Sequence, residues 1–172
     1  QRLLGRSFKE LDRHRLAELL GHADRRVRLK AQFELADRGE VDLLTGMAGT
    51  QEADQLSRIH SIWGVGQISR AETEVAAVLL PLLRDIDPVI RAMAARAVGD
   101  ARYRPGTDDL IPLLEDEEPR VRLLTLEALG RIGDRSAREP IADLLEREDD
   151  REVYFRQAGA IALSRIGDGE SL

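Results

Sequence analysis

Five arginines recur along the chain at nearly constant spacing, and each follows an acidic residue by four positions. The pairs are Asp24/Arg28, Asp54/Arg58, Asp87/Arg91, Glu118/Arg122 and Glu152/Arg156. A guanidinium is a planar fork of donors that matches carboxylate and phosphate groups. One interpretation is a row of forks that holds an anionic ligand. The other is a structural ladder of acids that cap helices and arginines that fix the stacking of neighbouring repeats. The structural interpretation is favoured, because an acid near each arginine would already occupy its donors.

Other residues that could do chemistry are few. His14, His22 and His60 lie on separate predicted elements and lack the i, i+4 spacing of a helical metal pair. His60 occupies a semi-core position, which is typical of a hydrogen-bonded core histidine. Cysteine is absent, which excludes disulfides, thiolate metal sites and cysteine nucleophiles. With no nucleophile–base pair and no glycine-rich phosphate loop, we expect no catalytic, cofactor or metal site.

The residues around Arg122 indicate what element carries each arginine. Glu118 stands where a helix N-cap belongs, and Pro119 occupies the first helical position. Apolar residues then recur at i, i+3, i+4, i+7, i+8 and i+11, which marks one continuous face of a helix. Gly133 is placed to end that helix in the left-handed conformation. Four more helices of this kind surround the other arginines.

The period of about 32 residues predicts a helical hairpin per repeat, and stacked hairpins bury the apolar side that a single one would leave wet. The expected fold is all-α: a right-handed α–α superhelix of about five hairpins, with the arginine-bearing second helices on the concave side. Capping boxes at 7–10 and 136–139 are expected to begin the first helices of the outer repeats. The expected repeats span residues 7–39, 40–70, 71–102, 105–134 and 135–168 of a single domain.

The composition fits this fold and limits the partners. Of 172 residues, 42% are hydrophobic and only 3% aromatic, so the core must consist of aliphatic side chains and alanine. The net charge is −6, and acids are interspersed with the arginines, so we expect no nucleic-acid partner. The sequence contains no apolar run of about 18 residues, the length that would predict a membrane span. Because the chain opens on Gln1, we expect it to be a fragment of a longer protein.

An apolar group stands out beside the first two arginines. Leu29, Phe33, Ile59 and Trp63 lie one and five positions after Arg28 and Arg58, off the main core face. The equivalent positions of later repeats are more polar. Either these four residues form an exposed patch that binds a partner, with the single tryptophan as anchor, or repeat packing and residues 1–6 cover them.

One end of the predicted stack is also marked. In the first arginine helix, Lys30, Glu34 and Arg38 replace residues that are apolar in later repeats. Terminal repeats need such a polar side. The N-terminal end of the solenoid is therefore expected here.

The pattern acid-x-x-Val-Arg-x-x-Ala-x-x-x-Leu-Gly resembles the HEAT-like repeat of the phycobilisome-lyase type. The resemblance covers nearly the whole chain and implies the solenoid fold. Such repeats serve as lyase subunits, scaffolds, adaptors and, rarely, DNA-repair enzymes. A narrower resemblance, carried by residues 28–36 and 58–67, is to the HEAT segment of large secreted bacterial dehydrogenase and haem-domain proteins. That parent would imply an extracytoplasmic location, and any other parent a cytoplasmic one.

Three functions follow as hypotheses. The first is a non-catalytic scaffold that binds another protein, or a neighbouring domain of its parent, on the concave face. The second is an accessory subunit that binds or processes a tetrapyrrole in the manner of a bilin lyase, for which His60, Tyr103 and Tyr154 offer partial support. The third, nucleic-acid binding in the manner of a repair enzyme, conflicts with the acidic charge balance.

Overall fold

The structure, a computed structural model, describes residues 7–147 and 153–167. Every regular element in these residues is helical. The elements are η1 (Phe8–Glu10), α1 (Arg13–Leu19), α2 (Arg25–Asp37), α3 (Val41–Gly49), α4 (Gln55–Ser69), η2 (Thr73–Arg84), α5 (Pro88–Asp100), η3 (Arg104–Gly106), α6 (Thr107–Leu110), η4 (Ile111–Glu115), α7 (Pro119–Ile132), η5 (Arg135–Ala137), α8 (Arg138–Arg147) and α9 (Val153–Gly167), where η denotes a 3-10 helix.

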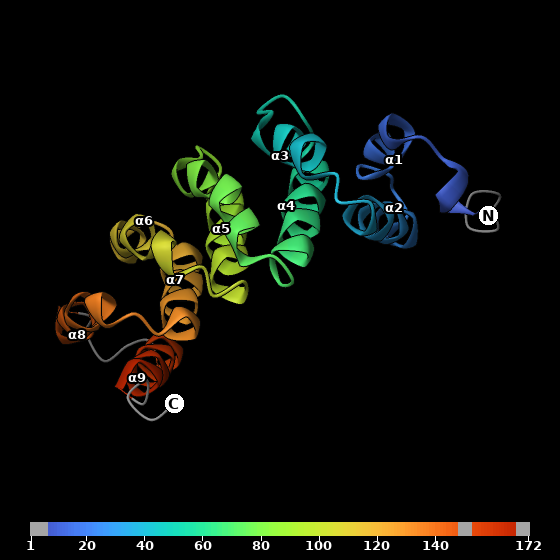
Figure 1. The fold of residues 1–172 in the computed structure, drawn as a ribbon. Coiled ribbons are helices and arrows are strands. Elements are labelled where there is room, and N and C mark those ends of the chain that lie inside the picture. The colour runs from blue at the N-terminus through green and yellow to red at the C-terminus, as the bar shows by residue number, and fades with distance from the viewer. Residues whose placement is uncertain (1–6, 148–152, 168–172) are drawn as a thin grey trace.

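The helices form an elongated, curved stack (Figure 1). α2, α4, α5, α7 and α9 lie side by side along the inner curve, each packed on the next. α1, α3, η2, the segment α6–η4, and α8 line the outer curve, each against the inner helix that follows it in the chain. This confirms the predicted all-α solenoid. No helix of the described residues is both long and apolar enough to cross a bilayer.

Short polar side chains begin the inner helices, as the repeat pattern predicts. Asp24, Asp54 and Asp87 are the N-caps of α2, α4 and α5, and each accepts a hydrogen bond from a backbone N–H of the first turn. These bonds satisfy donors that have no partner inside the helix. Gly133 ends α7 with a φ of 73°, in the left-handed region, as expected.

Small residues set how closely the inner helices approach one another. A glycine of α4, α5 or α7 faces an alanine of the following inner helix, and we call these contacts the glycine seam. They are Gly66/Ala97, Gly99/Ala128 and Gly130/Ala162. At Gly99 a Cβ would lie only 2.4 Å from the Ala128 Cα, so the two backbones touch where the side chain is missing. Gly66, inside α4, likewise lets the helix pack closely on Ala97 of α5.

The outer elements depart from the predicted regular helices. η2 is a 3-10 helix of 12 residues with Pro81 inside it, and η4 contains Pro112 near its start. Proline has no N–H, and its ring clashes with the carbonyl four residues earlier, which disfavours an α-helix. The repeated Leu-Leu-Pro-Leu-Leu and Leu-Ile-Pro-Leu-Leu stretches fold as i to i+3 turns or short helical pieces instead.

Both predicted capping boxes are wrong. Ser7 makes no capping hydrogen bond, and the chain is extended again at Leu11 before α1 begins with Asp12 as its N-cap. At the other end, Asp134 accepts the N–H of Ser136, so the aspartate caps the turn. In each case an aspartate that immediately precedes a helix-compatible stretch replaces the serine as cap.

The charged face of α2 lies at the N-terminal end of the described stack, as predicted. Residues 7–11 cover this face. Arg38 bonds Glu34 and donates to the carbonyl oxygens of Phe8, Lys9 and Leu11, which ties the first turn of the chain to α2. The ammonium of Lys30 lies 5.5 Å from the centre of the Phe8 ring. The charged side chains therefore anchor residues 7–11 onto the end of the solenoid.

Candidate binding surface on the concave face

The ladder arginines reach forward to the next repeat, but not to its N-cap acid. Arg58 forms an ion pair with Asp85, and Arg91 bonds Asp116 through its Nε and Nη2 at 2.7 and 2.8 Å. Asp85 and Asp116 each lie two residues before the N-cap of α5 or α7. Each also accepts the backbone N–H of that N-cap residue. One aspartate thus closes a turn and links two repeats.

In three of the ladder arginines, Nη1 binds the turn before the helix that carries the arginine, and in Arg28 it donates to the carbonyl oxygens of His22 and Ala23. Arg91 Nη1 donates to the carbonyl oxygens of Asp85 and Ile86, and Arg122 Nη1 donates to those of Asp116 and Glu117. The guanidinium of Arg122 also lies 5.6 Å from the centre of the Phe155 ring.

The Arg91–Asp116 pair is well shielded, with side-chain exposures of 13% and 9%. Burial raises the pKa of Asp116, but hydrogen bonds from Arg91 and from the Glu118 N–H outweigh it, so the pKa lies below the usual 3.8. The carboxylate stays ionised at neutral pH. These donors hold the repeats together, so this part of the ladder does not present a row of open forks.

The first arginine of the ladder differs from Arg58 and Arg91, because Arg28 donates a hydrogen bond to a histidine instead of an acid. Its Nε donates to Nε2 of His60 at 3.0 Å, while Nδ1 of His60 lies 2.8 Å from Oε1 of Gln32. His60 is only 2% exposed, and its ring contacts that of Trp63 edge-on at 4.9 Å between centres. Burial, and then the charge of Arg28, lower the pKa of His60 from 6.5 to about 4. The imidazole is neutral and hydrogen-bonded in the core, as predicted.

The remaining ladder residues fall into two groups. The carboxylates of Asp24, Asp54 and Asp87 cap helices and make no bond to the guanidinium four positions later, although each backbone carbonyl accepts the N–H of that arginine. Glu118 occupies its cap position without a side-chain cap hydrogen bond. Glu152 lies outside the described residues, and Arg156 is an exposed residue of α9. Within the described residues, the ladder acids stand at the N-termini of the inner helices, but their carboxylates do not pair with the arginine four positions later.

The four apolar residues expected in the patch separate into exposed and buried members. Phe33 is 48% exposed and Trp63 is 37% exposed, whereas Leu29 is half-buried and Ile59 is buried. Leu29, Phe33 and Trp63 line a hollow of about 540 Å³ that α2, α4 and α5 form on the concave face. We call it the aromatic hollow. Met93 and Ala97 also line it, together with polar side chains that include Gln32, Gln67, Arg70, Arg96 and Asp100.

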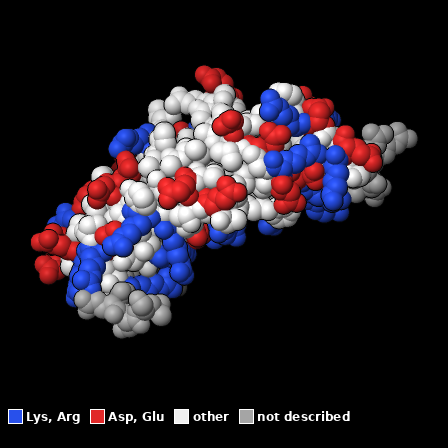
Figure 2. All heavy atoms as spheres, in the orientation of Figure 1, with Lys and Arg blue, Asp and Glu red and all other residues white. Residues whose placement is uncertain are grey.

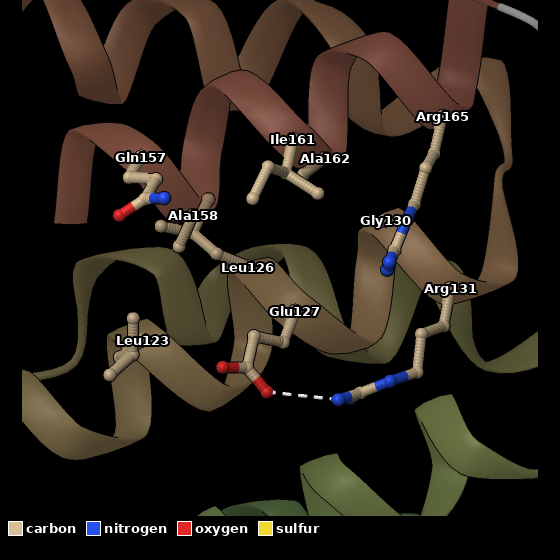
Figure 3. Close-up of a pocket in the computed structure, with 10 residues that line it drawn as sticks. All are labelled: Leu123, Leu126, Glu127, Gly130, Arg131, Gln157, Ala158, Ile161, Ala162 and Arg165. Atoms are coloured by element: carbon tan, nitrogen blue, oxygen red, sulfur yellow. Dashed lines mark hydrogen bonds and ion pairs between the residues drawn. The ribbon is translucent and has the colours of Figure 1, made fainter. Parts of the chain in front are cut away.

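A second hollow, of about 330 Å³, lies between α7 and α9 (Figure 3). Leu123 and Leu126 of α7 face Ala158 and Ile161 of α9 across it. Ile161 is 45% exposed, so this hollow also presents apolar surface to solvent. We call it the aliphatic hollow.

Charged side chains occupy the surface between these two hollows. Arg131 of α7 pairs with Glu127 at 3.0 Å and with Asp100 of α5 at 3.5 Å. Arg165 extends from α9 over Gly130, toward the end of α7 that carries Arg131 (Figure 3). Over the face drawn in Figure 2, acidic and basic side chains are interspersed, with a group of basic ones at the end that carries α8 and α9.

The concave face offers binding surface rather than a reactive centre. Among the described residues, no group of three or more His, Cys, Asp or Glu is placed to hold a metal ion. Tyr103 is buried and lies away from both hollows, and His60 is committed to Gln32 and Arg28. Neither residue projects into the concavity as the tetrapyrrole hypothesis requires. The side chain of Tyr154 lies outside the described residues, so that part of the hypothesis stays a prediction.

Comparisons with known proteins agree with this geometry. A family model described as HEAT repeats matches residues 107–172. Among solved structures, the complex of CpcE and CpcF of phycocyanin lyase from Nostoc sp. PCC7120 is 20% identical, with a TM-score of 0.67 over 94% of this chain and 67% of that one. The chain has a HEAT-like helical-repeat fold. No curated protein sequence matches it significantly.

Two further structures have the same HEAT-like or armadillo-like architecture. Human deoxyhypusine hydroxylase in complex with glycerol is 17% identical, with a TM-score of 0.63 over 90% of this chain and 62% of that one. A designed armadillo repeat protein in complex with the peptide (KR)4 is 16% identical, with a TM-score of 0.62 over 88% and 80% of the two chains. At these identities the likeness shows the fold of this HEAT-like chain.

Sequence reasoning missed several residues of this HEAT-like surface. Asp85 and Asp116 could have been found, since each precedes an acid-proline pair by two positions. Arg131 and Arg165 could also have been found, nine positions after Arg122 and Arg156, by continuing the +1, +5 series along the helix. Met93 carried no such signal, because it is a buried core residue that also lines the aromatic hollow.

Proposed function

We propose that this HEAT-like solenoid is a non-catalytic scaffold that binds a protein segment along its concave face, with Phe33 and Trp63 as anchors. The observation that carries the proposal is the aromatic hollow. Two large aromatic side chains, 48% and 37% exposed, lie on adjacent helices beside a hollow of about 540 Å³. Tryptophan is strongly enriched among residues that dominate binding energy, especially where a partner can desolvate it fully.

The surroundings of the two rings support a preformed site. The ring of Trp63 packs against that of His60 in a T-shaped contact, and His60 in turn is fixed by Gln32 and Arg28. A ring held in this way loses little conformational freedom when a partner covers it. The buried Oε1 of Gln67, at the rim of the aromatic hollow, has no hydrogen-bond partner among the described residues. A backbone N–H of a bound segment would satisfy this acceptor.

The relatives add support at the level of architecture. One similar structure is a complex of two proteins, and another is a complex with a peptide. Both make a solenoid that carries a protein ligand a reasonable model for this chain, although the two-protein complex is itself a phycocyanin lyase and a third similar structure is a hydroxylase. The proposal of a non-catalytic role therefore depends on the make-up of the hollows rather than on the fold.

Photo-crosslinking tests the proposal. A benzoylphenylalanine replaces Phe33 in one variant and Ile86, which is 81% exposed on the loop before α5, in a control variant. Irradiation in extract of the source organism should give a discrete protein adduct from position 33 only. Excess unlabelled wild-type chain should abolish the adduct, whereas the same excess of Trp63→Ala should not. Equal amounts of adduct from positions 33 and 86, or equal competition by the wild-type chain and Trp63→Ala, would refute the aromatic hollow as the binding site.

A further inference from the structure

Arginines converge on one hollow that joins the two apolar ones. This hollow, of about 830 Å³, is lined by Arg70, Arg102, Arg131 and Arg165, with Asp100 as its single acid. Four positive charges against one negative charge leave a formal +3 there, in a chain whose net charge is −6. We call it the basic hollow. It shares Arg70 and Asp100 with the aromatic hollow, and Arg131 and Arg165 with the aliphatic hollow.

The donors of the basic hollow are largely unused. Within the residues that the structure describes, neither Arg102 nor Arg165 makes a hydrogen bond or ion pair, and both are exposed. Arg70 uses only its Nε, to the Gly66 carbonyl of its own helix. Arg131 does have carboxylate partners, but its Nη1 is buried without a hydrogen-bond partner. These arginines differ from Arg58 and Arg91 of the ladder, whose guanidiniums are saturated.

The positions of these arginines also have an explanation that involves helix stability instead of ligand binding. Arg70, Arg131 and Arg165 lie at the C-terminal ends of α4, α7 and α9, where a cation interacts favourably with the helix dipole. That interaction accounts for a basic residue at each helix end. It does not account for Arg102, which lies beyond the C-cap of α5 and adds a fourth positive charge, or for the presence of a single acid among the residues that line the hollow.

We propose that the basic hollow receives the carboxylates of an acidic stretch in the bound segment, whose flanking apolar side chains enter the aromatic and aliphatic hollows. This inference rests on the proposed function and specifies the chemistry of its partner. Charge complementarity selects an acidic stretch as the occupant. Even when Glu127, which pairs with Arg131, is counted with Asp100, the arginines exceed the acids, so the hollow attracts an acidic segment and repels a basic one.

The helix spacing sets the expected pattern of the segment. Neighbouring packed helices lie roughly 10 Å apart, so the centre of the basic hollow, between α5 and α7, is about 15 Å from α4. An extended chain advances about 3.3 Å per residue. The acidic residues should therefore follow or precede the aromatic-hollow anchor by about four to five positions, with the second apolar residue about three to four positions beyond.

Selection from a phage-displayed library of random 12-residue peptides, on the immobilised chain, tests this pattern. The selected peptides should carry Asp or Glu between apolar residues at about these spacings. Their affinity should fall about tenfold in the double variant Arg102→Gln/Arg165→Gln, and should weaken steeply with salt. Arg120→Gln, which removes an exposed arginine of α7 that lines none of the hollows, should leave it unchanged.

The outcomes separate this inference from the function on which it rests. Selected peptides that are neutral or basic, and that depend on Trp63 but not on Arg102 and Arg165, would overturn the acidic partner and leave the scaffold intact. If no peptide is enriched, or if binding ignores Trp63→Ala, both proposals fail. A lower melting temperature of the double variant with unchanged peptide affinity would assign the arginines to helix ends alone.

Discussion

Replacing Gly99 by alanine tests whether backbone contact between the inner helices holds the solenoid together. The new Cβ would lie 2.4 Å from the Ala128 Cα and 2.5 Å from its Cβ. Since the first of these is a backbone atom, no rotation of a flexible side chain can relieve the clash. α5 and α7 must move apart along their shared face, which contains much of the central core.

The magnitude follows from two opposing effects. Overpacking of a close interior contact costs about 1–3 kcal/mol, and sometimes more. Alanine in place of glycine inside a helix returns up to about 1 kcal/mol. With the backbone itself in the way, the cost should prevail, and we expect a net loss of about 2 kcal/mol. For a chain of this length that corresponds to a melting temperature lower by about 4–8 °C.

The glycine seam supplies its own graded controls. A Cβ at Gly130 would lie 2.8 Å from the Ala162 Cα, so Gly130→Ala should be destabilising but less so. At Gly66 the nearest atom is a Cβ at 3.2 Å, so the two effects should nearly cancel. Gly46 of α3 has no atom within 4 Å of such a Cβ, and Gly46→Ala should stabilise by up to about 1 kcal/mol.

Urea unfolding followed by circular dichroism measures this order. The expected ranking of stability is Gly46→Ala, then Gly66→Ala, then Gly130→Ala, then Gly99→Ala. A Gly99→Ala protein that unfolds at the wild-type urea concentration, with the wild-type slope, would refute the seam as the contact that sets helix spacing.

Three further predictions concern the buried polar groups and the tryptophan. Because His60 has a pKa of about 4 in the folded chain against 6.5 when unfolded, its contribution to stability should be fully present well above pH 6.5 and should be lost as the pH falls toward 4, by about 2–3 kcal/mol at pH 4.5. Urea titrations of His60→Asn should lack most of this slope. Asp116→Asn should lower the free energy of unfolding in urea by about 3 kcal/mol, because it leaves Arg91 without its charged partner. Arg84→Gln breaks an ion pair whose arginine is 77% exposed and should cost under about 0.5 kcal/mol. Equal effects of the two substitutions would contradict the difference in burial between the two pairs. Acrylamide should quench Trp63 in the free chain, and a fully protected, strongly blue-shifted emission would show that the aromatic hollow is closed.

The sequence carried enough information to predict the inner helices and their stacking. Four local signals all favour an inner helix: an acid at the N-cap, a proline such as Pro119 in the first turn, the apolar periodicity, and a glycine such as Gly133 at the end. Each signal acts over a few residues. The outer elements were less predictable, because Pro81 and Pro112 compete with apolar patterns that would otherwise be helical. The capping boxes failed for a similar reason, since Asp12 and Asp134 offered better caps nearby.

The site was predictable only in part. Phe33 and Trp63 were found from their position after the ladder arginines, but their exposure depends on what the neighbouring helices leave uncovered. Ile59, at the equivalent position one turn earlier than Trp63, is buried by that same packing. The arginines of the basic hollow are separated by about 30 residues each. The spacing after the ladder arginines signals Arg131 and Arg165, but no such pattern signals Arg70 or Arg102.

The direct test of a concave docking surface is the fluorescence of Trp63, the single tryptophan of the chain, during titration with a selected peptide. A segment that enters the aromatic hollow must cover an indole that is 37% exposed in the free chain. Its emission should then shift to the blue and its quenching by acrylamide should fall in step with binding. Saturable binding with unchanged emission and unchanged quenching would contradict the account.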